Sequence, residues 1–219
     1  MVVAMGTKTS HPVFARLYAR LRPVMDRQGA AEHRARLLAG TAGRVVEVGA
    51  GEGANFGHYP PEVTGVVAIE PDPFLRAEAA RRASESVVQV EVVDGCAERL
   101  PVADGSADAV VMCLVLCSVT DQAAALAEAF RVVRPGGQLR FYEHVAALPG
   151  RRLARVQRIA DATVWPWLMG GCHVGRDTTA AIAAAGFVIE ELDRFDFPPG
   201  RPSPAAPHML GWAVREVAA

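Results

Sequence analysis

A run of β-branched residues breaks into three glycines at alternate positions, in the stretch Val45-Val46-Glu47-Val48-Gly49-Ala50-Gly51-Glu52-Gly53. Glycine adopts positive φ and has no Cβ, so such a turn lets backbone N–H groups approach a bound molecule closely. The pattern predicts a strand, a tight turn and the start of a helix. A nucleotide-like cofactor is the natural ligand of this arrangement, although a plain strand-to-helix turn is the alternative.

The spacing of the glycines narrows the choice of cofactor. It is G-x-G-x-G with Glu47 two positions before the first glycine, and it differs from the dinucleotide fingerprint G-x-G-x-x-G. This difference favours S-adenosylmethionine over NAD. A second apolar run, residues 66–69, ends in Glu70, about 20 residues beyond the glycines, where a carboxylate can accept hydrogen bonds from both ribose hydroxyls.

Strands and helices alternate through the middle of the chain. A third expected strand ends in Asp94, which would accept a hydrogen bond from an adenine amino group or merely cap the following turn. After Glu70 we expect strands over residues 87–93, 107–117 and 138–145, and a helix over residues 122–133. This alternation predicts an α/β fold, a Rossmann-like, doubly wound sheet with ligands at the carboxyl ends of its strands.

The two ends of the chain are less regular. Two expected helices before the glycines, with Pro23 breaking or kinking the first, would form a lid over the cofactor with Tyr18 facing inward, or pack on the sheet. After residue 149 an apolar stripe runs beside a basic face that contains four arginines. Basic amphipathic helices can lie on membranes, but a solvated arginine face on a packed helix is the commoner case.

Length and charge exclude several classes of partner. The 219 residues suit one α/β domain, and the formal charge of −1 does not favour nucleic acid or an anionic membrane. The first ten residues lack a signal-peptide core, and the longest apolar run, 109–117, is too short to span a bilayer, so we expect a cytoplasmic protein.

The four cysteines lack the spacing of zinc motifs, so we expect reduced thiols and no metal. Cys113 and Cys117 are both expected on the strand 107–117, where they would lie roughly 13 Å apart and could not share a metal.

Taken together, the series from Glu47 to Gly53, then Glu70, Asp94-Gly95 and 134–137, resembles the class I S-adenosylmethionine-dependent methyltransferases over nearly the whole chain. A set of short motifs is similar, more narrowly, to the methyltransferase-like 7 proteins, which methylate thiols. These motifs are Gly53-Ala54-Asn55-Phe56, Tyr59-Pro60-Pro61, 103–106, 114–119, Glu143-His144-Val145-Ala146, Gly171-Cys172, and Pro207-His208 with Gly211. The animal members carry an N-terminal hydrophobic anchor to the endoplasmic reticulum and lipid droplets. Residues 1–40 contain none, so that location is not expected to carry over.

The resemblance implies a seven-stranded sheet whose last strand, which bears His208, is antiparallel. It implies one domain over residues 1–219, made of N-terminal helices or lid (1–40), a cofactor-binding core (44–145) and an acceptor side (146–219). The glycines would hold the methionine portion of S-adenosylmethionine, Glu70 the ribose, and Asp94 with the Gly95-Cys96 backbone the adenine, while Glu47 would orient the turn or meet the amino group. The family's ribose-binding acid is typically Asp, and Glu70 is a longer equivalent. The candidate cofactor-binding residues are Tyr18, Glu47, Gly49, Ala50, Gly51, Gly53, Asn55, Glu70, Pro71, Asp94, Gly95, Cys96, Cys113 and Leu114.

The implied chemistry is an in-line displacement that moves positive charge off sulfur, so alignment and exclusion of water matter most. No metal is required, and a thiol is already partly ionised at neutral pH. His144 is the candidate general base because it ends a strand at the expected site and titrates near neutrality, although a structural role in a backbone hydrogen bond is the alternative. His173 and His208 are lesser candidates, for which a structural role is the alternative. The candidate acceptor-side residues are Phe14, Cys117, Trp165, Trp167, Cys172 and His208.

We therefore expect a methyltransferase acting on a small, largely apolar molecule, with a thiol or sulfide as the first choice. An oxygen or nitrogen acceptor, including a phospholipid amine, is the alternative. Arsenite would need the thiolates of Cys96, Cys117 and Cys172 to converge from separate loops. A non-catalytic S-adenosylmethionine-binding module also stays open, and we expect a monomer or homodimer.

Overall fold

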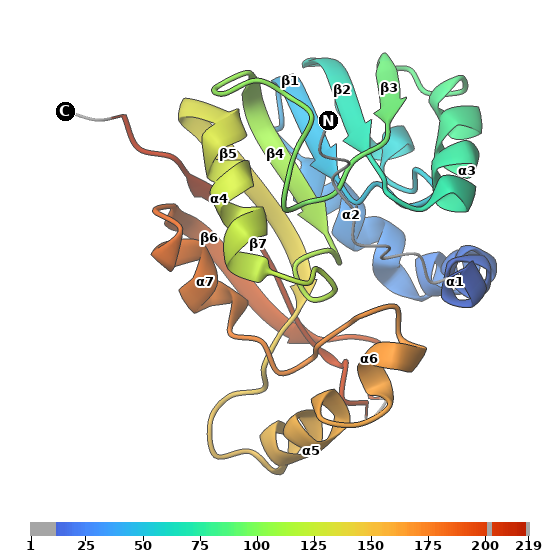
Figure 1. Ribbon diagram of the computed structural model, residues 1–219, viewed down its shortest axis with the longest axis vertical. Helices are drawn as coiled ribbons and strands as arrows, with labels where there is room; N and C mark the ends of the chain where they lie inside the picture. The colour runs from blue at the N-terminus through green and yellow to red at the C-terminus, as the bar shows by residue number, and fades with distance from the viewer. Residues whose placement is uncertain (1–11, 201–202, 218–219) are drawn as a thin grey trace, which may run out of the picture.

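Seven strands form one mixed sheet in the order β3-β2-β1-β4-β5-β7-β6 (Figure 1). The computed structural model describes residues 12–200 and 203–217, without the side chains of residues 12–14 and 18. β7 runs antiparallel to β5 and β6, and the other neighbouring strands are parallel. The strands are β1 (Gly43–Val48), β2 (Val63–Ile69), β3 (Val90–Val93), β4 (Ala107–Cys113), β5 (Val133–His144), β6 (Val188–Asp196) and β7 (Pro207–Val214). This confirms the predicted seven-stranded α/β sheet with an antiparallel last strand.

Helices close both faces of the sheet. α4 and α7 contact each other in front of it in Figure 1, over a core that contains Leu126 and Ile182, while Leu37 and Leu38 of α2 belong to the core of the opposite face. The helices are α1 (Pro12–Met25), α2 (Ala31–Leu38), α3 (Pro73–Ala83), α4 (Gln122–Val132), α5 (Arg152–Asp161), α6 (Trp165–Leu168) and α7 (Thr178–Ala184). With both faces covered, ligand access is left to the carboxyl edge of the parallel strands.

Aspartates fix where the helices of the sheet faces begin. The side chain of Asp72 accepts hydrogen bonds from the N–H groups of Phe74 (3.0 Å) and Leu75 (3.1 Å), and Pro73 occupies the first position of α3. Asp121 and Asp177 cap α4 and α7 in the same way. Such caps satisfy N–H groups that have no partner within the helix, so they fix the residue at which each of these helices begins.

Two predictions about helix ends are wrong. The glycine turn leads only into a short 3-10 helix, Phe56–His58, because Pro60 and Pro61 follow at once and cannot donate backbone hydrogen bonds. α1 continues through Pro23 to Met25, so the prediction that Pro23 breaks this helix is wrong. The chain instead changes direction at Gly29, whose φ of 117° interrupts a π-helical turn, Asp26–Ala30, before α2.

The central strand is shorter than predicted. β4 ends at Cys113 because Leu114 adopts a φ of 60°, and the next three N–H groups donate to the buried carboxylate of Glu143 rather than to a neighbouring strand. The prediction that Cys113 and Cys117 share a strand is therefore wrong. Cys117 lies in the turn beyond β4, which places it at the carboxyl edge of the sheet.

Only part of the apolar stripe predicted after residue 149 is buried: Ala160 packs against Cys117, Cys172 and Val174, whereas other members are exposed. Val156, Val164 and Trp167 are 46%, 63% and 75% exposed, and the arginines of α5 are exposed as well. Figure 1 shows α5 and α6 below the sheet, apart from the helices that cover its faces. Among the residues that the structure describes, none of the helices combines the length and the apolar character needed to cross a membrane.

Candidate active site

A cavity of about 550 Å³ lies at the carboxyl edge of the sheet, where residues that follow β1, β2, β4 and β5 meet. The volume is within the range of about 300–1,000 Å³ that is typical of pockets for small molecules. Ala15, Leu17, Leu21 and Met25 of α1 line one side of it. The first N-terminal helix therefore covers the site, as the lid interpretation predicts. The side chains of Phe14 and Tyr18, two candidate contacts, are outside the described part of the chain.

The three glycines of the turn have different roles. Gly49, Gly51 and Gly53 all have positive φ, of 65°, 58° and 81°. A Cβ on Gly51 would meet no atom within 4 Å, so this is the glycine whose missing side chain leaves room for a ligand. A Cβ on Gly53 would lie 2.5 Å from the ring of Phe56, and Gly53 does not line the cavity, so its predicted ligand contact is replaced by a packing role.

Glu70 connects the glycine turn to the end of β2. Its Oε2 accepts a hydrogen bond from the N–H of Gly51 (2.8 Å) and its Oε1 accepts one from the N–H of Asp72 (2.9 Å). Burial raises the pKa of Glu70, and the two N–H donors oppose that shift. Each carboxylate oxygen has a further lone pair, so Glu70 can still accept hydrogen bonds from two hydroxyl groups in the cavity.

Glu47 holds the far side of the same turn. Its two oxygens accept hydrogen bonds from Asn55 Nδ2 (2.9 Å) and from the hydroxyl of Tyr59 (2.7 Å), and burial raises its pKa to about 7. Of the two predicted roles for Glu47, these contacts correspond to orienting the turn. The buried Oδ1 of Asn55 has no hydrogen-bond partner within the described residues, and Asn55 lines the cavity. An N–H donor on a ligand would satisfy this oxygen.

The structure places Asp94 away from the cavity. Its side chain is 74% exposed and pairs with Arg76 at 2.9 Å, so the predicted hydrogen bond to adenine does not follow from this arrangement. The side chain turns toward α3, where Arg76 supplies a charged partner. Gly95 and Cys96 do line the cavity, as predicted, as does Pro71.

These features fit S-adenosylmethionine as the expected cofactor. Gly51 leaves an open approach, Glu70 offers acceptors for hydroxyl groups, and Asn55 has an unsatisfied acceptor within the same cavity. The remaining predicted cofactor contacts that the cavity brings together are Glu47, Gly49, Ala50, Cys113 and Leu114.

The acceptor side of the cavity contains most of the predicted residues. Cys117, His144, Trp165, Cys172 and His208 line it. Trp167 does not, and at 75% exposure it is a surface residue, so its predicted contact is wrong. Both tryptophans belong to α6, but residues two apart in a helix point about 200° away from each other around its axis.

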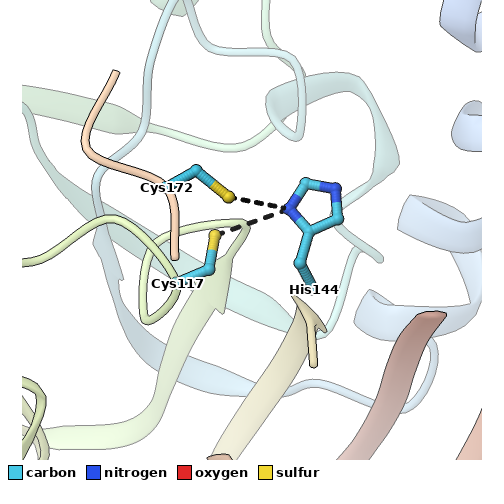
Figure 2. A group of neighbouring side chains, drawn as sticks. All are labelled: Cys117, His144 and Cys172. Carbon is cyan, nitrogen blue, oxygen red and sulfur yellow. Dashed lines mark hydrogen bonds between the residues drawn. The ribbon is translucent and has the colours of Figure 1, made fainter. Parts of the chain in front are cut away.

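Two cysteines and a histidine meet at this end of the cavity (Figure 2). The Nδ1 of His144 lies 3.6 Å from the sulfur of Cys117 and 3.5 Å from the sulfur of Cys172. The three residues come from the end of β5, the turn after β4 and the loop between α6 and α7. Their separation along the chain hid this cluster from sequence reasoning, which considered the thiols without His144.

The electrostatics distinguish the two histidines of the site. Burial lowers the pKa of His144, but its contact with Cys117 and the charges of Cys117 and Glu143 outweigh burial and raise it above the ordinary value. Burial and the neighbouring His144 lower the pKa of His208 to about 3, and its Nδ1 lies 2.8 Å from the carbonyl of Ala206. His144 is therefore the one of the two that can take up a proton near neutral pH.

Contact with Cys172 and burial raise the pKa of the Cys117 thiol. The neighbouring His144 opposes this shift, so the thiol of Cys117 and the imidazole of His144 titrate as a coupled pair.

Sequence reasoning missed several residues of the site. Glu52 forms an ion pair with Arg22 of α1, which ties the covering helix to the glycine turn. Phe197 and Pro198 add apolar wall beside His208. The position of Glu52 between two of the glycines was a signal for its contact with α1. The part played by Phe197 and Pro198 becomes visible only in the structure, where the chain returns to the cavity after β6.

Comparison with known proteins gives one consistent result. A family model described as "Methyltransferase domain" matches residues 46–141. The chain is 37% identical to "Thiol S-methyltransferase TMT1B" of Rattus norvegicus over 183 residues, which are 81% of this chain and 74% of that protein. It is 38% identical to "Thiol S-methyltransferase TMT1A" of Homo sapiens with the same coverage.

A solved structure of a putative methyltransferase from Bacillus halodurans superposes with a TM-score of 0.70 at 19% identity, covering 85% of this chain and 99% of that one. At this identity the superposition supports the fold alone.

Proposed function

Because the chain belongs to the thiol S-methyltransferase family, within the class I S-adenosylmethionine-dependent methyltransferases, we propose that it methylates the sulfur of a small, largely apolar thiol. The observation that supports a thiol acceptor is that one cavity contains both the glycine turn and the side chains of Cys117, His144 and Cys172. Apolar side chains that include Trp165 and Phe197 line this end of the cavity, together with Ser118, Ser203 and His208.

S-adenosylmethionine supplies a methyl group bonded to a positively charged sulfur. The chain's own residues hold the cofactor and align it with the acceptor. Gly51 allows the cofactor to approach the backbone closely, Glu70 accepts hydrogen bonds from its hydroxyl groups, and α1 together with the apolar walls excludes water. His144 is placed to accept the proton of the acceptor thiol at its imidazole. Since a free thiol is already a few per cent thiolate near pH 7, this assistance needs to be only modest.

The other acceptors receive less support. Methylation of arsenite calls for converging thiolates, and the cluster of ligand atoms within 4.8 Å contains two cysteines with His144 and does not include Cys96. An oxygen or nitrogen acceptor, a phospholipid amine, or a non-catalytic role as an S-adenosylmethionine-binding module has no specific contact in its favour. Cytoplasmic location and a monomeric or homodimeric state stay predictions.

The test is a comparison of acceptors with the purified protein and methyl-labelled S-adenosylmethionine. We expect label in alkyl or aryl thiols well above label in matched phenols, amines or phosphatidylethanolamine. Faster transfer to a phenol or an amine would overturn the choice of sulfur. Tight binding of S-adenosylhomocysteine without transfer to any acceptor would identify a binding module instead.

The role of His144 is tested separately. His144→Ala should lower the rate and change the pH profile, because the group that receives the proton is removed. His58→Ala is the matched control, since His58 does not line the cavity. An unchanged rate and pH profile in His144→Ala would remove His144 from the reaction.

A further inference from the structure

We propose that Cys117, His144 and Cys172 bind one zinc ion, and that the open fourth position of this ion receives the acceptor sulfur. The first half of the proposal concerns the three side chains alone. The second half rests on the proposed function. Zinc sites with three protein ligands and one open position are typical of catalysis, whereas structural sites have four protein ligands.

The distances agree with tetrahedral coordination. Zinc binds cysteine sulfur at about 2.3 Å and histidine nitrogen at about 2.0–2.1 Å, and these lengths at a tetrahedral angle separate sulfur from nitrogen by about 3.5 Å. The observed separations from His144 Nδ1 are 3.6 Å to Cys117 and 3.5 Å to Cys172. All three ligand atoms lie within 4.8 Å of one another. These separations put all three atoms within reach of one ion.

Hydrogen bonds account for part of this cluster, because Cys117 also contacts Cys172 and lies 3.5 Å from Ser118 Oγ, but they do not account for both contacts of His144. Nδ1 of an imidazole has either one lone pair or one proton in the ring plane, so it can form one good hydrogen bond, yet two sulfurs approach it (Figure 2). One metal ion at the centre would satisfy all three atoms. Cys117 and Cys172 are only 1% and 5% exposed, and they pack with Val174, Ala160 and Trp165. In such an apolar setting two thiolates with a divalent cation form a site without net charge.

The ligands are held by the backbone around them. The N–H of Cys117 donates to Glu143 at 3.2 Å, and the carbonyl of Cys117 accepts a hydrogen bond from the N–H of His173 at 2.7 Å. A Cβ on Gly171 would lie 2.9 Å from the carbonyl oxygen of Ser118, so the loop that bears Cys172 approaches the Cys117 turn as closely as only glycine permits. The donor geometry is thus preorganised, as a metal site requires.

The open position also suits the reaction. All three ligands line the cavity at its acceptor end. An incoming thiol would bind to the ion as thiolate and release its proton to solvent. Its sulfur would then form a bond to the methyl carbon while the bond from that carbon to the sulfonium sulfur breaks, and the electron pair of the broken bond stays on the cofactor as S-adenosylhomocysteine. The thioether product is neutral and a weaker ligand, so it can leave. In the zinc-loaded protein His144 is a ligand, so the ion stabilises the thiolate in place of the imidazole, and the role of His144 as a base belongs to the metal-free protein.

The binding experiment uses the full-length chain, stripped with a chelator and kept reduced. Zinc is titrated in competition with a chromophoric chelator, and cobalt(II) is used as a spectroscopic probe for thiolate-to-metal charge transfer. We expect one ion per chain and a loss of affinity of about 100-fold or more in Cys117→Ser and in Cys172→Ser. Cys96→Ser is the matched control and should bind zinc like the wild type, because Cys96 is outside the cluster. Circular dichroism checks that each variant is folded.

The absence of stoichiometric zinc binding would overturn the site, and so would equal affinity in the wild type and the two cysteine variants. For the second half, the rate of thiol methylation is compared between the stripped and the zinc-loaded protein as a function of pH. We expect the loaded protein to stay active to lower pH, because the ion stabilises the thiolate. Identical profiles would overturn the activating role.

The two proposals fail in different ways. Thiol methylation by a chain that binds no zinc refutes the metal site and leaves the proposed function in place. Zinc binding that depends on Cys117 and Cys172, without methylation of any thiol, supports the site and refutes the proposed function.

Discussion

Replacing Glu70 with glutamine should weaken the binding of S-adenosylhomocysteine by about 10- to 150-fold. Both carboxylate oxygens of Glu70 already accept backbone hydrogen bonds, from Gly51 at 2.8 Å and Asp72 at 2.9 Å. Glutamine must turn an NH₂ group toward one of these donors, and it offers the ribose hydroxyls no charged acceptor. A hydrogen bond to a charged group contributes about 1.5–3 kcal/mol, and about 1.4 kcal/mol corresponds to a tenfold change in affinity. The loss of one such bond to the ligand gives the stated range.

The assay is isothermal titration calorimetry with S-adenosylhomocysteine, accompanied by thermal unfolding of the protein without ligand. Glu85→Gln is the matched control, because Glu85 is an exposed glutamate in the turn after α3 and does not line the cavity. Its affinity should equal that of the wild type. If Glu70→Gln is folded and binds within twofold of the wild type, Glu70 does not hold the ribose and the assignment of the cavity is wrong.

Four further substitutions test the glycine turn and the two buried glutamates. Gly51→Ala should abolish cofactor binding and lose only about 1–2 kcal/mol of stability, because its φ is positive but its Cβ would meet no neighbouring atom. Gly53→Ala should unfold at a clearly lower temperature, because its Cβ would meet Phe56. Calorimetry and thermal melts of both variants check this, and equal behaviour of the two would contradict it. Glu143→Ala leaves three buried N–H groups without their acceptor, and each lost acceptor costs about 1–3 kcal/mol of folding stability. The melting temperature should therefore fall by at least about 6 °C. A fall of less than about 2 °C would show that water or another group replaces the carboxylate. Burial raises the pKa of Glu47 to about 7, so the wild type loses stability as pH rises from the ordinary carboxyl pKa to about 7, and its stability is level above that pH. Between pH 5 and pH 8, the free energy of unfolding from urea titrations should therefore change in favour of Glu47→Gln by about 2–3 kcal/mol. A difference between the two proteins that does not depend on pH would mean that Glu47 is ionised throughout.

Much of the fold was predictable because its signals are local. The β-branched runs and the alternation of strand and helix predicted the parallel strands, and the pattern of glycines followed by Glu70 predicted the side of the cavity formed by Gly51 and Glu70. Positive φ and the absence of a Cβ are properties of glycine itself, so the sequence reports them wherever the glycine occurs. The family resemblance, carried by motifs along the chain, is confirmed by the relatives.

Other features depend on contacts between distant segments. The apolar run from residue 107 to 117 reads as one strand, but the carboxylate of Glu143, on the neighbouring strand, captures three N–H groups and ends β4 at Cys113. Asp94 follows a strand as an adenine-binding acid would, but Arg76 turns it outward. In both cases a partner from another element competes with the local pattern, and no local pattern records the competition.

The sequence by itself determined the class of sheet, the glycine turn and the family, since the spacing of apolar residues and short motifs indicate each of them. Only the tertiary structure decided that Cys117, His144 and Cys172 meet around one point. The reason is physical. Pairing of β4 with β5 and the close approach of Gly171 to Ser118 bring together the turn after β4, the end of β5 and the loop between α6 and α7. The spacing of the three residues along the chain does not indicate that approach.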